Sequence, residues 1–162
     1  MPDHGSNLEY FLAIDGVEGG STDRSHHNEI VIRSFIWGVT APVAPGGGGG
    51  VGRPHFEDLG LVAPSSVASP RLLLEAASGR HHAVVTLTGR RAGGDHPADV
   101  VTIALTGVVV TSFRQHGDRD GLVDEFTLSY GSIRETWVAP SASGAPAAPV
   151  VGRWDVARQV PA

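Results

Sequence analysis

The chain has 162 residues, no cysteine and a formal net charge of -5. This length fits one domain over residues 1–162, and a chain of this size buries roughly 70% of its unfolded surface. The lack of cysteine excludes a disulfide framework, a thiolate nucleophile and a Cys-based metal site. The acidic balance argues against a nucleic-acid partner, which calls for a basic face. No apolar run approaches the roughly 18 residues of a membrane-spanning helix, so we expect no membrane insertion.

The amino-terminal residues and the overall composition add two expectations. Residues 1–10 are polar and carry neither a basic region nor an apolar region, so we expect no secretory signal peptide. Glycine (22) and proline (11) together supply about a fifth of the residues. That share is typical of a turn-rich β protein rather than of a helical bundle.

Strands and one glycine-rich loop are predicted in the first third of the chain. Residues 8–14 form a mixed apolar run that predicts the first strand. Residues 28–37 predict a second strand, and because apolar side chains occur on both parities we expect it to be covered on both faces over part of its length. Residues 42–54 hold five consecutive glycines, which predict a loop because glycine loses the most backbone freedom in a regular element. A short strand over 55–62 follows.

One helix is predicted over residues 69–79. Ser69 is an N-cap type, Pro70 suits the first helical position, and Gly79 fits the left-handed residue that closes a helix. Three apolar residues make the stripe expected to face the core: Leu72, Leu73 and Ala76. The helix spans only about two turns, so packing rather than intrinsic propensity must hold it.

The second half of the chain reads as β structure. Residues 82–91 and 99–113 predict a hairpin joined by a turn at 92–95. A turn region is predicted over 115–121, and residues 122–137 alternate apolar and polar side chains as a strand does.

The chain is expected to end in a loop and a strand. Residues 139–149 are small and proline-rich, which indicates an exposed loop, and 150–160 predict a closing strand. One short helix among seven or eight strands predicts a mainly β fold, either a barrel or a sandwich.

Two patterns approach known binding sites without meeting their requirements. Gly47 and Gly52 have the spacing of a phosphate-binding loop, but Arg53 and Pro54 replace the required lysine and hydroxyl, and a strand follows instead of a helix. Residues 118–125 are acidic but lack the ligand spacing of a calcium loop. We interpret the first as a loop and the second as a tight turn.

The histidines offer little for metal binding. Two pairs are adjacent, at 26–27 and 81–82, and adjacent residues on a strand face opposite sides. His26 with Asp23 or Glu29 stays open as a metal-binding combination, although solvated histidines at strand ends are the simpler interpretation. No Gly-x-Ser-x-Gly elbow occurs, and nothing singles out a carboxylate pair. We therefore expect no catalytic residue, no cofactor and no metal.

Several short segments stand in a fixed order along the chain. They are Gly19-Gly20-Ser21-x-Asp23-x-x-His26-x-x-Glu29-Ile30 with Phe35-Ile36-Trp37-Gly38, the five-glycine loop with Gly52-Arg53 and Asp58-Leu59, Ala68-Ser69-Pro70-x-Leu72 with Gly79-Arg80-His81, Arg90-Arg91-Ala92-Gly93-Gly94, Glu125-x-x-x-Leu128, and Gly152-x-Trp154-Asp155. Each is weak alone. Over residues 8–160 their ordered combination resembles the hemolysin-coregulated protein (Hcp) family, the tube component of type VI secretion systems.

The sequence departs from the family pattern at five places. Ile36 stands where the family often has serine between two aromatic residues, on a strand that contributes to the inner wall of the family's ring. Gly20 replaces a glutamate, and Arg53 and Arg91 replace lysines, which keeps the charge but changes the hydrogen-bond geometry. Residues 137–141 match the family's penultimate segment only loosely.

The resemblance implies a compact barrel of two antiparallel sheets with one short helix. In the family, six copies form a ring, and rings stack into a hollow tube that carries small effector proteins. A contractile sheath expels this tube together with a spike protein, so the chain would be cytoplasmic before firing and then secreted without a signal peptide. The implied role is structural, not enzymatic.

The resemblance also assigns roles to two regions. Ile36 would face the lumen, and the extended loop over 39–54 would reach the adjacent ring. The ring-stacking residues would be Gly46, Gly47, Gly48, Gly49 and Gly50. Other interpretations stay open: a linker without contacts at this loop, an enzyme carried on a tube scaffold, a free-standing β-barrel binding module, or the tube protein of a related contractile injection machine.

Overall fold

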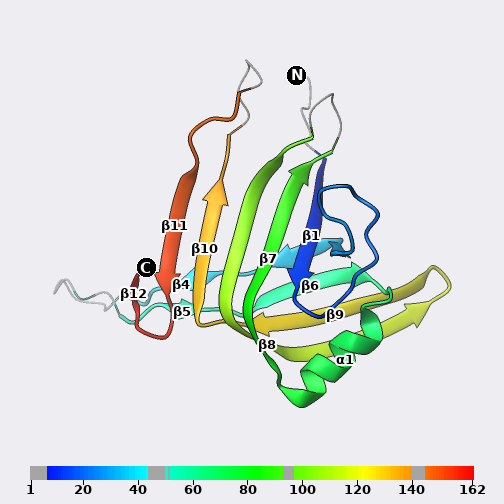
Figure 1. Ribbon diagram of the computed structural model, residues 1–162. Helices are drawn as coiled ribbons and strands as arrows, with labels where there is room; N and C mark the ends of the chain where they lie inside the picture. The colour runs from blue at the N-terminus through cyan, green and yellow to red at the C-terminus, as the bar shows by residue number, and fades with distance from the viewer. Residues whose placement is uncertain (1–6, 44–49, 51, 93–96, 140–144) are drawn as a thin grey trace.

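The computed structural model describes residues 7–43, 50, 52–92, 97–139 and 145–162 (Figure 1). Within these residues the chain forms twelve strands and one helix. The elements are β1 (Leu8–Ile14), β2 (Ile30–Ile32), β3 (Ser34–Ile36), β4 (Val39–Thr40), β5 (His55–Phe56), β6 (Leu59–Pro64), α1 (Ser69–Ser78), β7 (His81–Arg91), β8 (Asp99–Asp118), β9 (Gly121–Ser129), β10 (Ser132–Trp137), β11 (Val150–Asp155) and β12 (Val160–Pro161). No helix in this part of the chain is long and apolar enough to cross a membrane.

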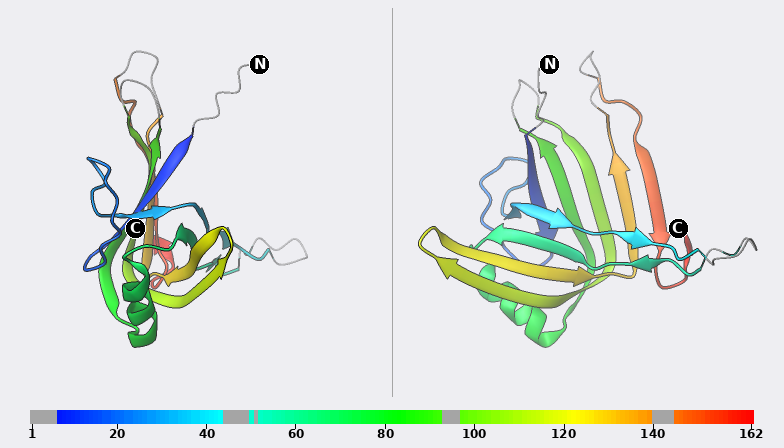
Figure 2. Two further views of the ribbon diagram at one scale, coloured as in Figure 1. Left: turned by 90° about the vertical axis from the view of Figure 1, so that its right-hand side faces the viewer. Right: turned by 180° about the vertical axis from the view of Figure 1, so that it is seen from behind.

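The strands pair in a closed antiparallel circuit that makes two layers. β2 pairs with β1, β1 with β7, β7 with β8, β8 with β9, β9 with β6, and β6 with β3. The circuit closes because β2 and β3 follow each other directly in the chain. The upright strands β1, β7, β8 and β10 form one layer, and β3, β6 and β9 cross it as the other (Figure 2). The predicted β-barrel of two antiparallel sheets with one short helix is therefore confirmed.

The chain changes layer at Arg33. β2 pairs with β1 and β3 pairs with β6, so residues 28–37 do not form the single predicted strand. The Arg33 backbone N–H donates to the Val62 carbonyl oxygen at 2.8 Å, which ties this junction to β6. The sequence has apolar residues at both odd and even positions of 28–37, which predicted one strand covered on both faces. They occur instead because the segment changes its partner strand from β1 to β6.

A bend in β8 makes the second junction between the layers. One edge of β8 pairs with β7, while its other edge pairs first with β10 and then with β9. Gly107 has a φ of 59°, in the left-handed region that favours glycine, and the nearby Gly131 N–H donates to the Thr106 carbonyl at 2.8 Å. The strand runs on to Asp118, so the predicted turn over 115–121 is shorter than expected.

The later strands are also divided where a single one was predicted. Residues 122–137 form β9 and β10, separated at Tyr130 and Gly131, because β9 belongs to the crossing layer and β10 to the upright one. The predicted closing strand over 150–160 is a hairpin of β11 and β12. These two strands extend the upright sheet beyond β10.

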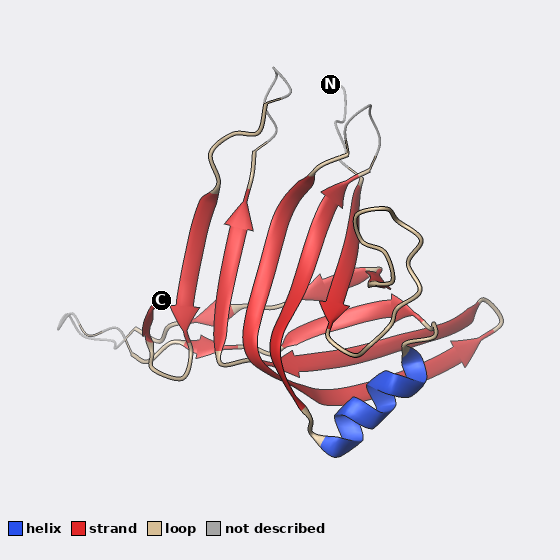
Figure 3. Ribbon diagram, viewed as in Figure 1, coloured by secondary structure: helices blue, strands red, loops and turns tan. Residues whose placement is uncertain are grey.

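The helix α1 occupies the predicted position, but two details of the prediction are wrong. Ala68, not Ser69, is the N-cap, while Gly79 closes the helix at φ 63° as expected. Leu72 is buried in the core, whereas Leu73 is 54% exposed. Successive helical residues are rotated by about 100°, so Leu72 and Glu75 share the inner face and Leu73 turns away from it. Figure 3 shows α1 lying beside β8.

Two buried carboxylates attach the helix to the sheets. Glu75 is 2% exposed and contacts His82 Nε2 and Arg71 Nε, at 3.0 and 3.1 Å. The second carboxylate, Asp124, is 1% exposed and accepts a hydrogen bond from the Ser69 hydroxyl at 2.5 Å. Buried charges are stable only when they are hydrogen-bonded, so these contacts position α1 on the barrel.

The core lies between the two layers and includes the inner face of α1. Its largest fully buried apolar side chains are Phe126, Leu12, Ile30, Leu59, Leu61, Leu72, Ile103, Leu105, Leu128, Val85 and Val108. These residues come from both layers, so each layer covers the apolar face of the other.

Candidate functional site

A groove lies at Ile36 on the outer face of the crossing layer, which is formed by β3, β6 and β9. The strand registers place Ile36 opposite Gly60, Gly60 opposite Thr127, and Thr127 opposite Ser112. Gly60 carries no side chain beside Ile36, where an added Cβ would lie 3.2 Å from Ile36 Cγ2. This gap leaves Ile36 72% exposed, as an apolar group on an open strand surface.

A second row of side chains runs parallel to the first. Ser34 lies opposite Val62, Val62 opposite Glu125, and Glu125 opposite Arg114. Together the two rows line a groove of about 430 Å³. It therefore has an apolar side near Ile36 and Val62 and a charged side at Glu125 and Arg114, which suits a surface that contacts another polypeptide.

The ends of the glycine-rich segment are held side by side. β4 pairs with β5 through Val39 opposite Phe56, and the Gly52 N–H donates to the Pro42 carbonyl at 2.7 Å. Phe56 stacks on Trp154 with ring centroids 6.3 Å apart, which anchors this small sheet to β11. Of the predicted stacking residues, Gly46, Gly47, Gly48 and Gly49 lie outside the described residues, and Gly50 is exposed. The second predicted loop, 139–149, is described only at 139 and 145–149.

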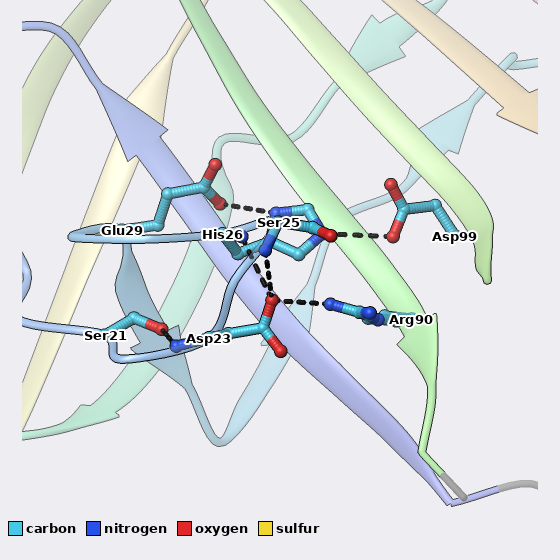
Figure 4. A network of polar contacts seen from close by, with 7 residues as sticks. All are labelled: Ser21, Asp23, Ser25, His26, Glu29, Arg90 and Asp99. Atoms are coloured by element: carbon cyan, nitrogen blue, oxygen red, sulfur yellow. Dashed lines mark hydrogen bonds and ion pairs between the residues drawn. The ribbon is translucent and has the colours of Figure 1, made fainter. Parts of the chain in front are cut away.

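The segment between β1 and β2 is fastened to the end of the β7–β8 hairpin by His26 (Figure 4). The His26 ring stacks on Phe11 with centroids 4.6 Å apart. Its Nδ1 lies 3.0 Å from Glu29 Oε2, and its Nε2 lies 3.0 Å from Asp99 Oδ1. A neutral imidazole has only one N–H, so both contacts are hydrogen bonds only when the ring is doubly protonated.

A second ion pair strengthens this attachment. Arg90 Nη1 donates to Asp23 Oδ1 at 2.5 Å, and the same carboxylate oxygen accepts the backbone N–H groups of Ser25 and His26. Burial acts to raise the pKa of Asp23, but these hydrogen bonds and the nearby charges of Arg90 and His26 outweigh it and lower the pKa. The carboxylate is thus held in its charged form.

The pKa of His26 responds to the same surroundings. Burial acts to lower it, but the hydrogen bond with Asp99 and the charge and hydrogen bond of Glu29 outweigh burial, so the pKa is raised above its ordinary value. The raised pKa agrees with the two carboxylate contacts. His26 therefore links three elements through its ring contacts rather than acting as a free ligand.

The interpretation of the histidines as solvated is wrong for His26 and His82, which are 5% and 4% exposed. The expected partner Glu29 does contact His26, but the other partner, Asp99, is 73 residues away and no local spacing could reveal it. No group of three or more potential ligands that could hold a metal ion occurs in the described part of the chain. In the acidic segment 118–125, the Asp120 N–H donates to Asp118 Oδ1 within a tight turn, as interpreted from the sequence.

Comparisons with known proteins agree with the fold and with the family resemblance of the sequence. The sequence model described as "Type VI secretion system effector, Hcp" matches residues 11–137. Protein hcp1 of Pseudomonas aeruginosa is 30% identical over 160 residues, covering 96% of this chain and 99% of its own.

Solved structures with the same fold include Hcp1 from Salmonella typhimurium. It is 23% identical, has a TM-score of 0.80 and covers 96% of this chain and 99% of its own. A type VI secretion system effector from Yersinia pestis is 26% identical, has a TM-score of 0.74 and covers 90% and 98%. With the family model matching most of its length, this chain belongs to the Hcp family of type VI secretion proteins.

Proposed function

We propose that the chain is the structural subunit of a type VI secretion inner tube. Six copies form a ring, and the rings stack into a hollow tube that a contractile sheath expels behind a spike protein. The whole chain, 1–162, acts as one tube domain. It is held in the cytoplasm until it is expelled, and it has no enzymatic role, cofactor or metal.

Exposed apolar side chains at the margin of the upright sheet carry this proposal. Val150 is 71% exposed and Trp137 46%, at directly opposed positions of β11 and β10. Clustered apolar surface of this kind marks an interaction site in a soluble protein. A head-to-tail ring would bury it, because each subunit then presents a different surface to each of its two neighbours.

We propose that Ile36 faces the lumen and that its groove contacts small effector proteins. The support is its 72% exposure on β3, next to a glycine that leaves the groove open. An isoleucine at this place makes the surface less polar than the serine typical of the family would. We therefore expect this tube to hold effectors that present apolar side chains.

The loop over 39–54 is proposed to contact the adjacent ring through Gly46–Gly50. Pro42 and Gly52 hold its two ends together, so the segment leaves and re-enters the barrel at one place. Ordering five glycines costs about 1 kcal/mol or more each, so stacking should be weak and cooperative. Deleting Gly46–Gly50 should leave single rings intact and impair stacking; loss of the rings themselves would place the loop at a different interface.

Negative-stain microscopy with light scattering on the purified protein tests the proposal. We expect ring-shaped particles with a central pore and a mass of six subunits, which approach stacks as the concentration rises. Solitary particles without a pore, across salt and crowding conditions, would contradict the proposal.

A free-standing binding barrel is the second candidate. The groove of about 430 Å³ beside Ile36 favours it, because a cavity of this size is in the range of small-molecule sites. This candidate requires a strict monomer at high concentration, so the same light-scattering measurement separates the two. A tube protein of a related contractile machine would also form rings, and the sheath protein that co-purifies with it would identify the machine.

A further inference from the structure

Two arginines face each other on the outer surface of the upright sheet. Arg134 of β10 lies directly opposite Arg153 of β11, and both side chains are exposed. Side chains at directly opposed positions of an antiparallel pair have Cβ atoms roughly 5 Å apart, and like charges there destabilise the pairing. Neither arginine forms an ion pair with any described residue.

The neighbours of this arginine pair leave its charge uncompensated. Residues across the sheet on the same face are uncharged: Val84, Thr86, Thr102, Ala104, Thr106, Ser132, Thr136 and Val151. The one carboxylate on this face of β11, Asp155, accepts the Arg158 backbone N–H at 2.8 Å and lies 3.8 Å from Arg158 Nε. The result is a flat surface with two positive charges at its centre, which fits a partner with two closely spaced carboxylates.

The chain itself carries a surface of that description. Glu57 and Asp58 are adjacent between β5 and β6, both are exposed, and neither is ion-paired within the described residues. Asp58 Oδ2 accepts the Thr111 hydroxyl at 2.8 Å, and the Glu57 carbonyl accepts the Tyr130 hydroxyl at 2.8 Å, which fixes the turn that presents both side chains.

Tyr130, whose hydroxyl donates to the Glu57 carbonyl, lies beside this turn. Burial together with the charges of Asp58 and Glu57 raises the pKa of Tyr130 to about 12. In the other acidic turn, Asp118 and Asp120 flank Arg119, so their charge is partly compensated. The Glu57–Asp58 pair is therefore the better match for two unpaired guanidinium groups.

We propose that Arg134 and Arg153 of one copy bind Glu57 and Asp58 of the next copy in a head-to-tail contact. This inference rests on the proposed function, since it names the contact by which neighbouring subunits recognise each other. The arginines lie on β10 and β11 and the acidic pair lies between β5 and β6, so the contact joins two different surfaces, as a heterologous interface requires. With a net charge of -5, a nucleic-acid partner is disfavoured.

Charge reversal with a swap tests the contact. The variants are Arg134→Glu with Arg153→Glu, Glu57→Arg with Asp58→Arg, and one chain with all four changes. We expect each double reversal to weaken association by at least about tenfold, because like charges then face each other across the interface. The four-change chain should recover most of the wild-type mass in light scattering, since complementarity is restored with its sign exchanged.

The control reverses two exposed arginines elsewhere, Arg24→Glu with Arg119→Glu, and changes the net charge by the same amount and in the same direction as the arginine reversal. It should assemble like the wild type, and circular dichroism should show that every variant is folded. Wild-type assembly should also weaken as salt is raised.

The outcomes separate this contact from the proposed function. Arginine-reversed chains that still form wild-type rings, or a four-change chain that does not recover, refute the contact while leaving the tube function standing. A wild-type chain that stays monomeric under all conditions refutes the tube function and the contact with it.

Discussion

Replacing Asp124 by alanine should destabilise the protein strongly. Asp124 Oδ1 accepts hydrogen bonds from the Ser65 hydroxyl at 2.6 Å and the Gln115 amide at 2.9 Å, and Oδ2 accepts the Ser69 hydroxyl at 2.5 Å. Hydrogen bonds to a charged group contribute about 1.5–3 kcal/mol each, and an orphaned buried donor costs about 1–3 kcal/mol. Water can reach Ser65 and Gln115 but not Ser69, which is 7% exposed, so the expected net loss is about 2–4 kcal/mol.

Asp124→Asn is the matched comparison, because it keeps the shape and one acceptor. The serine hydroxyls can rotate to accept from the new amide, so we expect a smaller loss, about 1 kcal/mol. Urea unfolding followed by tryptophan fluorescence at one protein concentration measures both variants. If alanine costs less than asparagine, or if both cost nothing measurable, the helix is not held through this carboxylate.

Two further predictions concern the His26 link and the bend in β8. His26→Gln should remove a stabilisation that is fully present below the ordinary pKa of 6.5 and that disappears as the pH rises through the raised folded-state pKa. Urea midpoints of the two proteins should thus converge at alkaline pH, and a difference that does not change with pH would contradict the charged link. Gly107→Ala should cost about 1 kcal/mol or more, because alanine is strained at φ 59° even though the added Cβ would have room. Gly152→Ala, at a glycine in β11 that has open space and no positive φ, is the control; equal melting temperatures for the two variants would show that the bend imposes no strain.

The elements predicted well from the sequence are those whose signals are local. β1 occupies residues 8–14 as predicted, because an apolar run there meets an Asp-Gly turn. The closing of α1 at Gly79 also follows from one residue, since glycine adopts the left-handed conformation at little cost. The hairpin of β7 and β8 required only two β-rich runs and a short connection.

The errors arise where a distant partner decides the outcome. The break at Arg33 depends on the position of β6, which the alternation within 28–37 does not reveal. Ser69 has the chemistry of an N-cap, yet its hydroxyl bonds to Asp124, 55 residues later in the chain. The contact of His26 with Asp99 likewise joins segments that no spacing rule connects.

The margin of the upright sheet connects the proposed assembly to the fold. The strands that close the barrel pair with one another and leave no free edge between them. β10, β11 and β12 extend beyond these strands and end in an open edge. Within the described residues, β11 pairs with β12 only at Trp154 and Asp155, so the outer backbone groups of Val150 to Arg153 have no strand partner. An unpaired edge with exposed apolar side chains favours uncontrolled association. A neighbouring subunit that covers this edge in one fixed orientation would convert that hazard into a defined interface, and the arginine pair on the same strands would set which surface of the neighbour is accepted.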